Sequence, residues 1–157
     1  MLLSYRLPRE PSTPRIAVWR RLRRLGVAQL GDGVVGLPCD ARTQEQLEWV
    51  AEQVVEAGGE STLWRGRPTS ARDEQRLVHH LAAAREAEYR DIRDRAESAT
   101  GISGPELVKV VRSLRRELRQ VQRRDYFPPP SRDQAKIAVV TLAQLASAAT
   151  DRVSLEA

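Results

Sequence analysis

The chain is poor in residues that mark several classes of protein. It holds one cysteine, Cys39, among 157 residues, which excludes a disulfide framework and a cysteine-based zinc site. A reducing cytoplasm is therefore the expected compartment. Aromatic residues make up only 4% of the chain, too few to predict a platform on which successive bases stack. No apolar run approaches the roughly 20 residues of a membrane span, so we expect no membrane contact.

Signatures of catalysis are also missing. The two histidines, His79 and His80, are adjacent, and neighbouring residues on a helix point about 100° apart, so they cannot easily share one metal ion. We expect them to be a solvated or half-buried pair, and we expect Cys39 to be a packed small side chain. Gly31-Asp32-Gly33 predicts a tight hairpin, not a phosphate-binding loop. The sequence therefore predicts no enzyme, no metal and no cofactor.

Arginine is what the chain has in excess. Lysine occurs only at Lys109 and Lys136, so all but two of the 26 basic residues are arginine, and the net charge is +5. A guanidinium pairs with phosphate and other oxyanions through a planar fork, which favours an anionic partner. A GC-rich coding bias would also replace lysine with arginine, and composition alone does not separate the two explanations.

Residues 1–68 predict alternating strands and helices. In order, we expect a strand at 2–7, a helix at 13–25, strands at 27–30 and 34–37, a helix from 43 to the glycines at 58 and 59, and a strand at 61–65. Thr13 and Thr43 are the expected helix N-caps, and Gly26 is expected to end the first helix. The order predicts an α+β protein that begins with a ferredoxin-like βαββαβ domain. The first helix is expected to bury Val18, Trp19, Leu22 and Leu25.

Residues 69–157 predict a helical extension of three helices, two of them forming an antiparallel hairpin. The first runs from Ser70 to about residue 99, with charges of both signs on a solvated surface. The second starts at Pro105, and its heptad seam is Leu107, Val111, Leu114, Leu118 and Val121. We expect this seam to form an antiparallel pair with the preceding helix, because the connection is short, and self-association as a homodimer is the alternative. The third runs from Ser131 to about residue 150 and is expected to bury Ala138, Leu142, Leu145 and Ala149.

Two arginine clusters are the candidate binding residues. Residues 1–31 hold seven arginines and one acid, Glu10. The second cluster lies on one face of a predicted helix, away from the leucine seam, where it would suit a phosphate backbone. The alternative is a solvated face paired with acids of the neighbouring helix. No base-reading motif is present, so backbone contacts would dominate. The candidates are Arg15, Arg20, Arg23, Arg24, Arg112, Arg116, Arg119 and Arg123.

The order of elements resembles the small ferredoxin-like proteins of CRISPR adaptation and the matching domain of phenylacetate-pathway repressors. Members of the first group proposed as nucleases carry an aspartate at the end of the first strand. Here that place is occupied by Tyr5-Arg6-Leu7. The resemblance therefore does not extend to a metal-dependent nuclease.

A more specific resemblance is carried by the residues themselves. The N-terminal domain of ChrB-type chromate resistance proteins is similar to this sequence at Leu3-Ser4-Tyr5-Arg6-Leu7-Pro8, Ser12-x-x-Arg15-x-x-x-Trp19-Arg20-x-Leu22, Gly26-Val27-Ala28-Gln29-Leu30 and Arg123-Arg124-Asp125-Tyr126-Phe127-Pro128. The resemblance covers nearly the whole chain. Longer members carry a second domain, which we expect this chain to lack.

This resemblance implies a chromate-responsive regulator of a chromate efflux operon. The implied partners are DNA and chromate or a similar oxyanion, which arginine forks would bind well. A non-enzymatic dimerisation module with a helical arm is the alternative function. A third class, a chromate reductase or nuclease, lacks support from any flavin site, metal site or catalytic acid in the sequence.

Overall fold

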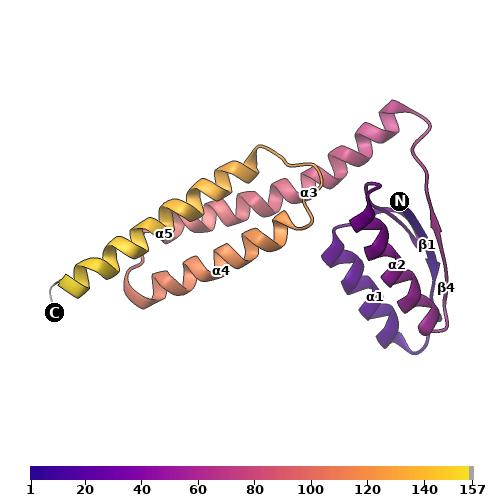
Figure 1. Ribbon diagram of the computed structural model, residues 1–157, viewed down its shortest axis with the longest axis horizontal. Coiled ribbons are helices and arrows are strands. Elements are labelled where there is room, and N and C mark those ends of the chain that lie inside the picture. Colours follow the sequence, from indigo (N-terminus) through magenta and orange to yellow (C-terminus); the bar gives the residue numbers. More distant parts are fainter. Residues whose placement is uncertain (156–157) are drawn as a thin grey trace. The chain divides into compact units, whose positions relative to one another are not determined.

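The computed structural model describes the backbone of residues 1–155 and the side chains of residues 1–149 (Figure 1). The chain divides into two compact units, Met1–Leu81 and Ala82–Ala157. The predicted domain boundary after residue 68 falls inside the first unit and stays a prediction.

A four-stranded antiparallel sheet organises the first unit. Its elements are β1 (Leu2–Arg6), α1 (Ser12–Leu25), β2 (Ala28–Gly31), β3 (Val34–Gly36), α2 (Ala41–Glu56) and β4 (Glu60–Trp64). The strand order is β2-β3-β1-β4, and each neighbouring pair is antiparallel. α1 packs beside α2, which packs on β1 and β4 (Figure 1). The predicted α+β class and antiparallel sheet are confirmed.

The hairpin between β2 and β3 is tied to β1 through a glycine. Gly33 has a φ of 68°, and its carbonyl accepts a hydrogen bond of 2.7 Å from the Tyr5 N–H. A Cβ at Gly33 would collide with the Tyr5 carbonyl, so both the backbone angle and the close approach require glycine. This contact places Tyr5 next to the hairpin turn.

The core of the first unit uses a narrower stripe of α1 than we predicted. Val18 and Leu22 are buried, four residues apart, but Trp19 is 52% exposed. The prediction that Trp19 is buried is therefore wrong. Its side chain leaves the helix about 100° from Val18, which turns it from the core toward the flank of α1. The other fully buried side chains of this unit are Leu3, Val35, Thr43, Leu47, Val50 and Val54.

Both N-cap predictions for this unit are wrong. α1 begins at Ser12 with Pro11 at the N-cap, which makes no side-chain hydrogen bond. At α2 the cap is Asp40, whose Oδ1 accepts from the Thr43 N–H at 2.8 Å while the Thr43 hydroxyl accepts from the Asp40 N–H at 3.1 Å. The N-cap of α2 thus lies three residues earlier than expected, and Asp40 and Thr43 form a capping box. Gly26, with a φ of 70°, ends α1 as predicted.

Helices make up the second unit. α3 (Ala71–Ser98) starts in the first unit and continues into the second, followed by a 3-10 turn, α4 (Gly104–Gln122) and α5 (Ser131–Leu155). The Ser70 hydroxyl accepts from the Asp73 N–H at 3.1 Å, which confirms the predicted cap of α3. In the described part of the chain, no helix has the length and apolar character of a membrane span.

The heptad seam of α4 is buried inside its own chain. All five seam residues belong to one core cluster with Tyr89 and Ile92 of α3 and with residues of α5. The α5 members are Ala135, Val139, Leu142, Ala143 and Ala146. The predicted α5 stripe is confirmed at Leu142, which is buried, and Ala138 packs against the cluster while partly buried. It is wrong at Leu145, which is 45% exposed. Alanines occupy both possible heptad frames of α5 and only Leu142 belongs to both, so the pattern alone could not choose between them.

Candidate functional site

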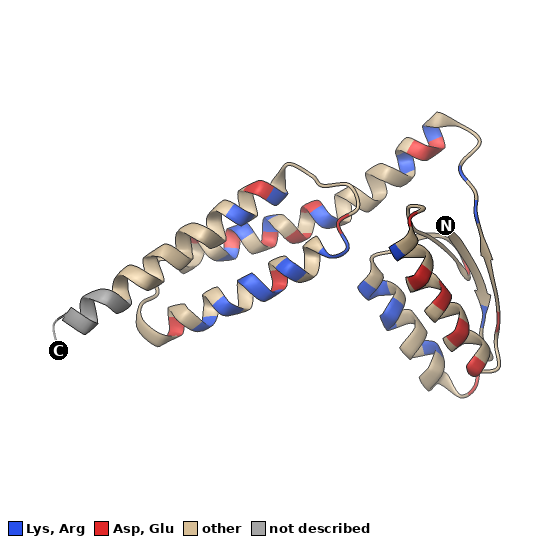
Figure 2. Ribbon diagram, in the orientation of Figure 1, with Lys and Arg blue, Asp and Glu red and all other residues tan. Residues whose placement is uncertain are grey.

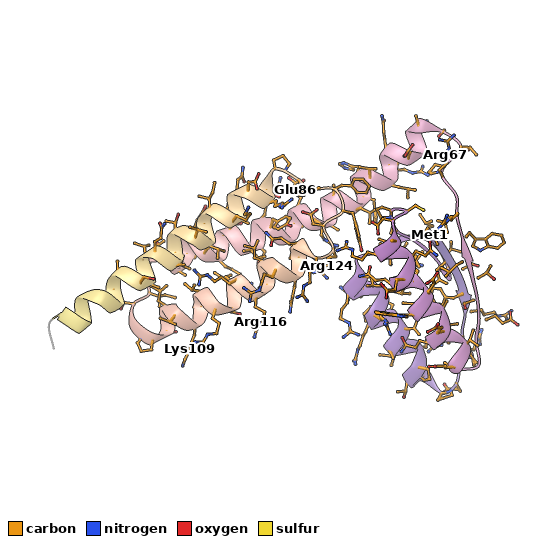
Figure 3. The ribbon with its side chains drawn as sticks, in the orientation of Figure 1. Met1, Arg67, Glu86, Lys109, Arg116 and Arg124 are labelled. Atoms are coloured by element: carbon orange, nitrogen blue, oxygen red, sulfur yellow. The ribbon has the colours of Figure 1, made fainter. Side chains whose placement is uncertain are left out.

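A face of arginines runs along α4 in the second unit. We call Arg112, Arg115, Arg116, Arg119 and Arg123 the α4 arginine face. All five are exposed, and they follow one another at helical spacing on the side opposite the buried seam. Figure 2 shows the basic residues along α4, and Figure 3 marks Arg116.

This face is free of internal ion pairs. Among side chains 1–149, no carboxylate forms an ion pair with any of the five arginines. The acid nearest to them in sequence, Glu117, binds Arg95 of α3 instead, with Oε2 2.6 Å from Nη1 and Oε1 3.1 Å from Nη2. The Arg95 hydrogen bonds hold the pKa of Glu117 below its ordinary value. Ion pairs between this face and acids of a neighbouring helix are therefore not found among these side chains.

Three members of the face line a groove beside α5. Arg112, Arg115 and Arg119 border an open groove of about 380 Å³. Its remaining lining residues are Val108, Val111, Ala143, Ala146 and Ser147, so arginines border a mainly apolar floor. Arg115 was not among the predicted site residues, although its spacing of three from Arg112 and four from Arg119 would have placed it on the same face.

The arginines of α1 lie in a different electrostatic setting. Arg15, Arg20, Arg23 and Arg24 are all exposed. The neighbouring helix α2 carries exposed acids at positions 45, 48, 52 and 56, which Figure 2 shows as a red stripe. These acids lower the positive potential around α1. The structure brings Arg15 and Arg20 together at one open cleft of about 480 Å³, whereas Arg23 lies 4.8 Å over the ring of Trp19.

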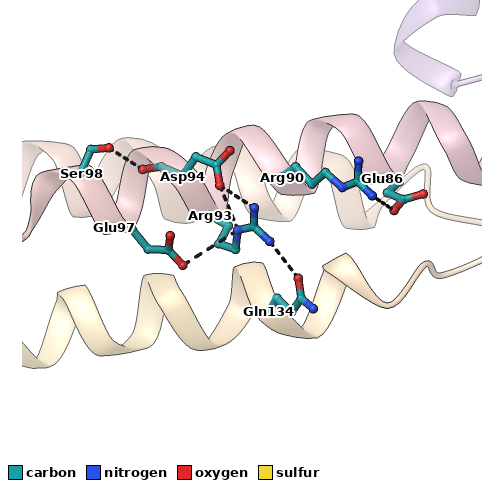
Figure 4. A network of polar contacts seen from close by, with 7 residues as sticks. All are labelled: Glu86, Arg90, Arg93, Asp94, Glu97, Ser98 and Gln134. Carbon is teal, nitrogen blue, oxygen red and sulfur yellow. Dashed lines mark hydrogen bonds and ion pairs between the residues drawn. The ribbon is translucent and has the colours of Figure 1, made fainter.

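Most arginines of α3 are already engaged. Arg90 pairs with Glu86, and Arg93 binds Asp94 at 2.7 Å and the Gln134 side chain of α5 at 3.0 Å (Figure 4). These contacts match the mixed-charge surface predicted for this helix. The guanidinium groups of Arg90 and Arg93 are occupied by contacts within the chain. They are therefore poor candidates for binding an external ligand.

The second unit contains a buried polar network that the sequence pattern did not predict. Arg85 is only 8% exposed, and its Nε lies 3.2 Å from Glu88 Oε2. Glu88 Oε1 also accepts from Arg124, just past the end of α4, at 3.0 Å. The Tyr89 hydroxyl donates to Asp125 at 2.8 Å, and burial together with this bond raises the pKa of Tyr89. The sequence does contain an indication that Arg85 is buried. Arg85 lies four residues before the buried Tyr89 and therefore on the same face of α3.

The cysteine and the two histidines lie on the surface. Cys39 is exposed, so its prediction as a packed side chain is wrong. His79 and His80 are exposed as well. Within the part of the chain that the structure describes, no three His, Cys, Asp or Glu side chains gather as a metal site.

Comparison with known proteins decides the family. The family model described as "Protein ChrB, N-terminal" matches residues 15–100, more than half of the chain. The chain belongs to the ChrB N-terminal family. Protein ChrB of Cupriavidus metallidurans is 26% identical over 141 residues, which cover 87% of this chain and 43% of that protein. The chain thus spans less than half the length of this relative, and no solved structure matches it.

The resemblance to the N-terminal domain of ChrB-type chromate resistance proteins is confirmed. The segment matched by the ChrB family model contains the arginines of α1 and the Arg85, Glu88 and Tyr89 part of the buried network. The α4 arginine face lies beyond residue 100 and therefore outside the matched segment. Family membership alone consequently assigns no role to that face.

Proposed function

We propose that this ChrB-family chain is a chromate-responsive transcriptional regulator that binds DNA without catalysing a reaction. One observation carries the proposal: the α4 arginine face is exposed and free of ion pairs among the described side chains. An arginine without an internal ion pair is ready to bind an external anion, because no existing ion pair has to be broken. Membership of the ChrB family supplies the link to chromate resistance.

The dimensions of the α4 arginine face suit a nucleic-acid backbone. From Arg112 to Arg123 the helical rise amounts to roughly 16 Å. A DNA strand carries one phosphate per roughly 3.4 Å of helix axis, so this length faces about five phosphates. Five guanidinium groups thus meet a similar number of negative charges. Such contacts fix position and affinity, and sequence-dependent DNA shape would supply specificity.

The first unit supports the proposal less directly. Its α1 arginines add positive charge, but the acids on α2 oppose a long contact with DNA there. The strand order β2-β3-β1-β4 with two helices supports a ferredoxin-like assignment for this unit. On this proposal, α4 makes the main DNA contact and α1 a weaker one.

The test is a gel shift with DNA from upstream of the protein's own gene and a random duplex of equal length and base composition. At about 150 mM salt, the upstream duplex should bind more tightly, and chromate should change that affinity. Sulfate at the same concentration is the matched control, since it is also a divalent tetrahedral oxyanion. The salt dependence should have a log–log slope of about −4.5 if five phosphates are contacted. Equal binding to both duplexes would contradict the regulator.

A second candidate function, a homodimeric assembly module, is favoured by a different surface. The heptad seam that first suggested it is buried within the chain. α5 nevertheless exposes Ile137 and Val140 by 67% and 53%, together with Leu145. Light scattering at high concentration tests self-association through this face. Ile137→Lys should dissociate a dimer, whereas Val55→Lys on α2, also at an exposed position, should not. A strict monomer would remove this candidate.

A further inference from the structure

The cleft beside α1 combines apolar, aromatic and cationic groups. Its lining comes from the end of β1 and the residue after it, the hairpin turn and one side of α1, and consists of Tyr5, Leu7, Arg15, Ile16, Trp19, Arg20 and Gly33. At about 480 Å³, it falls in the range of roughly 300–1,000 Å³ that is usual for small-molecule sites. All of these residues belong to the first unit, so the cleft does not depend on the α4 arginine face.

Trp19 contributes an exposed aromatic ring to the lining of this cleft. Trp19 is 52% exposed, so it is not packed against the sheet. The Arg23 guanidinium lies 4.8 Å from the centre of the ring, a cation–π contact that restrains the indole. A restrained and exposed indole is suited to stacking against another planar ring, because little side-chain freedom is lost on contact.

The polar groups of the cleft are open to a ligand. The guanidinium groups of Arg15 and Arg20 form no ion pair among side chains 1–149. The Tyr5 hydroxyl makes no hydrogen bond within the same set of residues. Two free arginines favour a phosphate group, and the Tyr5 hydroxyl can donate to or accept from a neighbouring polar edge.

We propose that this cleft binds a single nucleotide, with its base stacked on Trp19 and its phosphate held by Arg15 and Arg20. Neither part of the site is sufficient alone: the ring favours a planar aromatic group, and the arginines favour an anion beside it. A base inside a duplex is covered on both faces, so the ligand is a free nucleotide or an unpaired nucleotide of a strand. This goes beyond the proposed duplex binding, which concerns α4 and the phosphate backbone.

Calorimetric titration of the full chain with AMP, adenosine and inorganic phosphate tests the proposal. AMP should bind more tightly than either of its two parts. Trp19→Ala should weaken AMP binding by about tenfold, the usual order for loss of one stacking contact, and Trp19→Phe should retain most of it. Replacing Arg15 and Arg20 by glutamine should make AMP bind no better than adenosine.

Matched controls lie on the same unit. Trp49→Ala removes a similarly exposed tryptophan that also has an arginine over its ring, Arg21 at 5.7 Å, but that does not line the cleft. Arg24→Gln removes an exposed arginine of α1 outside the cleft. Both variants should bind AMP as the parent does. Circular dichroism confirms that each variant is folded, which is expected because the replaced side chains are exposed.

An oligothymidylate of eight nucleotides distinguishes a free nucleotide from an unpaired nucleotide of a strand as the ligand. The background is a variant with glutamine at positions 112, 115, 116, 119 and 123, so that the α4 arginine face cannot contribute. Oligothymidylate binding that persists there and falls with Trp19→Ala identifies an unpaired strand, whereas binding of AMP alone identifies a free nucleotide. Unchanged AMP binding in Trp19→Ala, or no saturable binding of either probe at millimolar concentration, overturns the proposal. Neither result bears on duplex binding by α4.

Discussion

Two neighbouring helices of the second unit use arginine in opposite ways. On α3, Arg85, Arg90, Arg93 and Arg95 all have carboxylate partners within the chain. On α4, the arginine face has none among the described side chains. Glu117 lies on α4 between these arginines in sequence, yet it pairs with Arg95 of α3. The distribution of acids therefore separates arginines that hold the structure together from arginines that are free to bind.

This difference shows why the arginine count alone carried little information. A coding bias toward arginine would affect both helices alike. It would not place the acids so that one helix is internally neutralised and the other is left positive. The binding hypothesis therefore rests on where the carboxylates are, and the following experiments test that separation.

Removal of the α4 arginine face should have the largest effect. Replacement of all five arginines by glutamine should weaken duplex DNA binding on the order of a thousandfold at low salt, because electrostatic contacts dominate non-specific affinity. The control replaces Arg15, Arg20, Arg23 and Arg24 of α1 and should lose much less. Fluorescence anisotropy with a labelled duplex measures both. Equal losses in the two variants would abolish the distinction between the helices.

The opposite face of α4 should determine stability. Leu114 is fully buried in the core cluster, so Leu114→Ala should lower the free energy of unfolding by about 3 kcal/mol through lost burial and the remaining cavity. Arg116→Ala, two residues along and exposed, should change it by less than about 0.5 kcal/mol. Urea unfolding followed by circular dichroism gives both values. A small effect at Leu114 would show that the seam is loosely packed.

Arg85 should behave as a structural arginine. Arg85→Met removes one partner of the buried network and leaves Glu88 with Arg124 alone, so we expect a loss of about 2 kcal/mol in unfolding free energy. The same replacement at Arg112 should be nearly neutral for stability. DNA affinity should show the reverse order, with Arg112→Met the more damaging. If either variant lost both stability and DNA affinity, Arg85 and Arg112 would not have separate structural and binding roles.

The smallest effect should be pH-dependent. Because the pKa of Glu117 is lowered in the folded chain, its bond with Arg95 stabilises the protein above the ordinary glutamate pKa of 4.5 and is lost as pH falls through the lower folded value. Glu117→Gln should therefore cost about 0.5 kcal/mol at pH 7, as partly exposed ion pairs do. Between pH 7 and pH 3 the difference in urea midpoint between the variant and the parent should shrink, because the Glu117 carboxylate becomes protonated. A constant difference across this range would mean that the effect comes from packing.

The parts of the fold that could be predicted are those with strong local signals. The hairpin at Gly31-Asp32-Gly33, the helix end at Gly26 and the Ser70 cap each depend on a few adjacent residues. The α4 seam was also predictable, since its five branched apolar residues occupy a single heptad frame. The α5 frame was not, because alanine is small enough to lie on either face, and only packing against α4 selects one.

The candidate site was predictable only in part. Helical spacing identified four members of the α4 arginine face. It could not predict whether these arginines form ion pairs with carboxylates of the same chain. Whether an arginine is paired depends on contacts between residues far apart in sequence, such as Arg95 and Glu117, which are separated by 22 positions. The same limit applies to Trp19, which has the right spacing to be buried and is instead part of a cleft with Tyr5. Non-local geometry, not composition, decides these roles.

The position of the tryptophans has a practical consequence for spectroscopy. All three, Trp19, Trp49 and Trp64, belong to the first unit, whereas long helices form most of the second. Emission from indole therefore follows unfolding of the sheet-containing unit, while ellipticity at 222 nm mainly follows the helical one. Coincident transitions by the two signals would show that α3, which is shared between the units, makes them unfold cooperatively. Two separate transitions would yield an independent stability for each unit without cutting the chain.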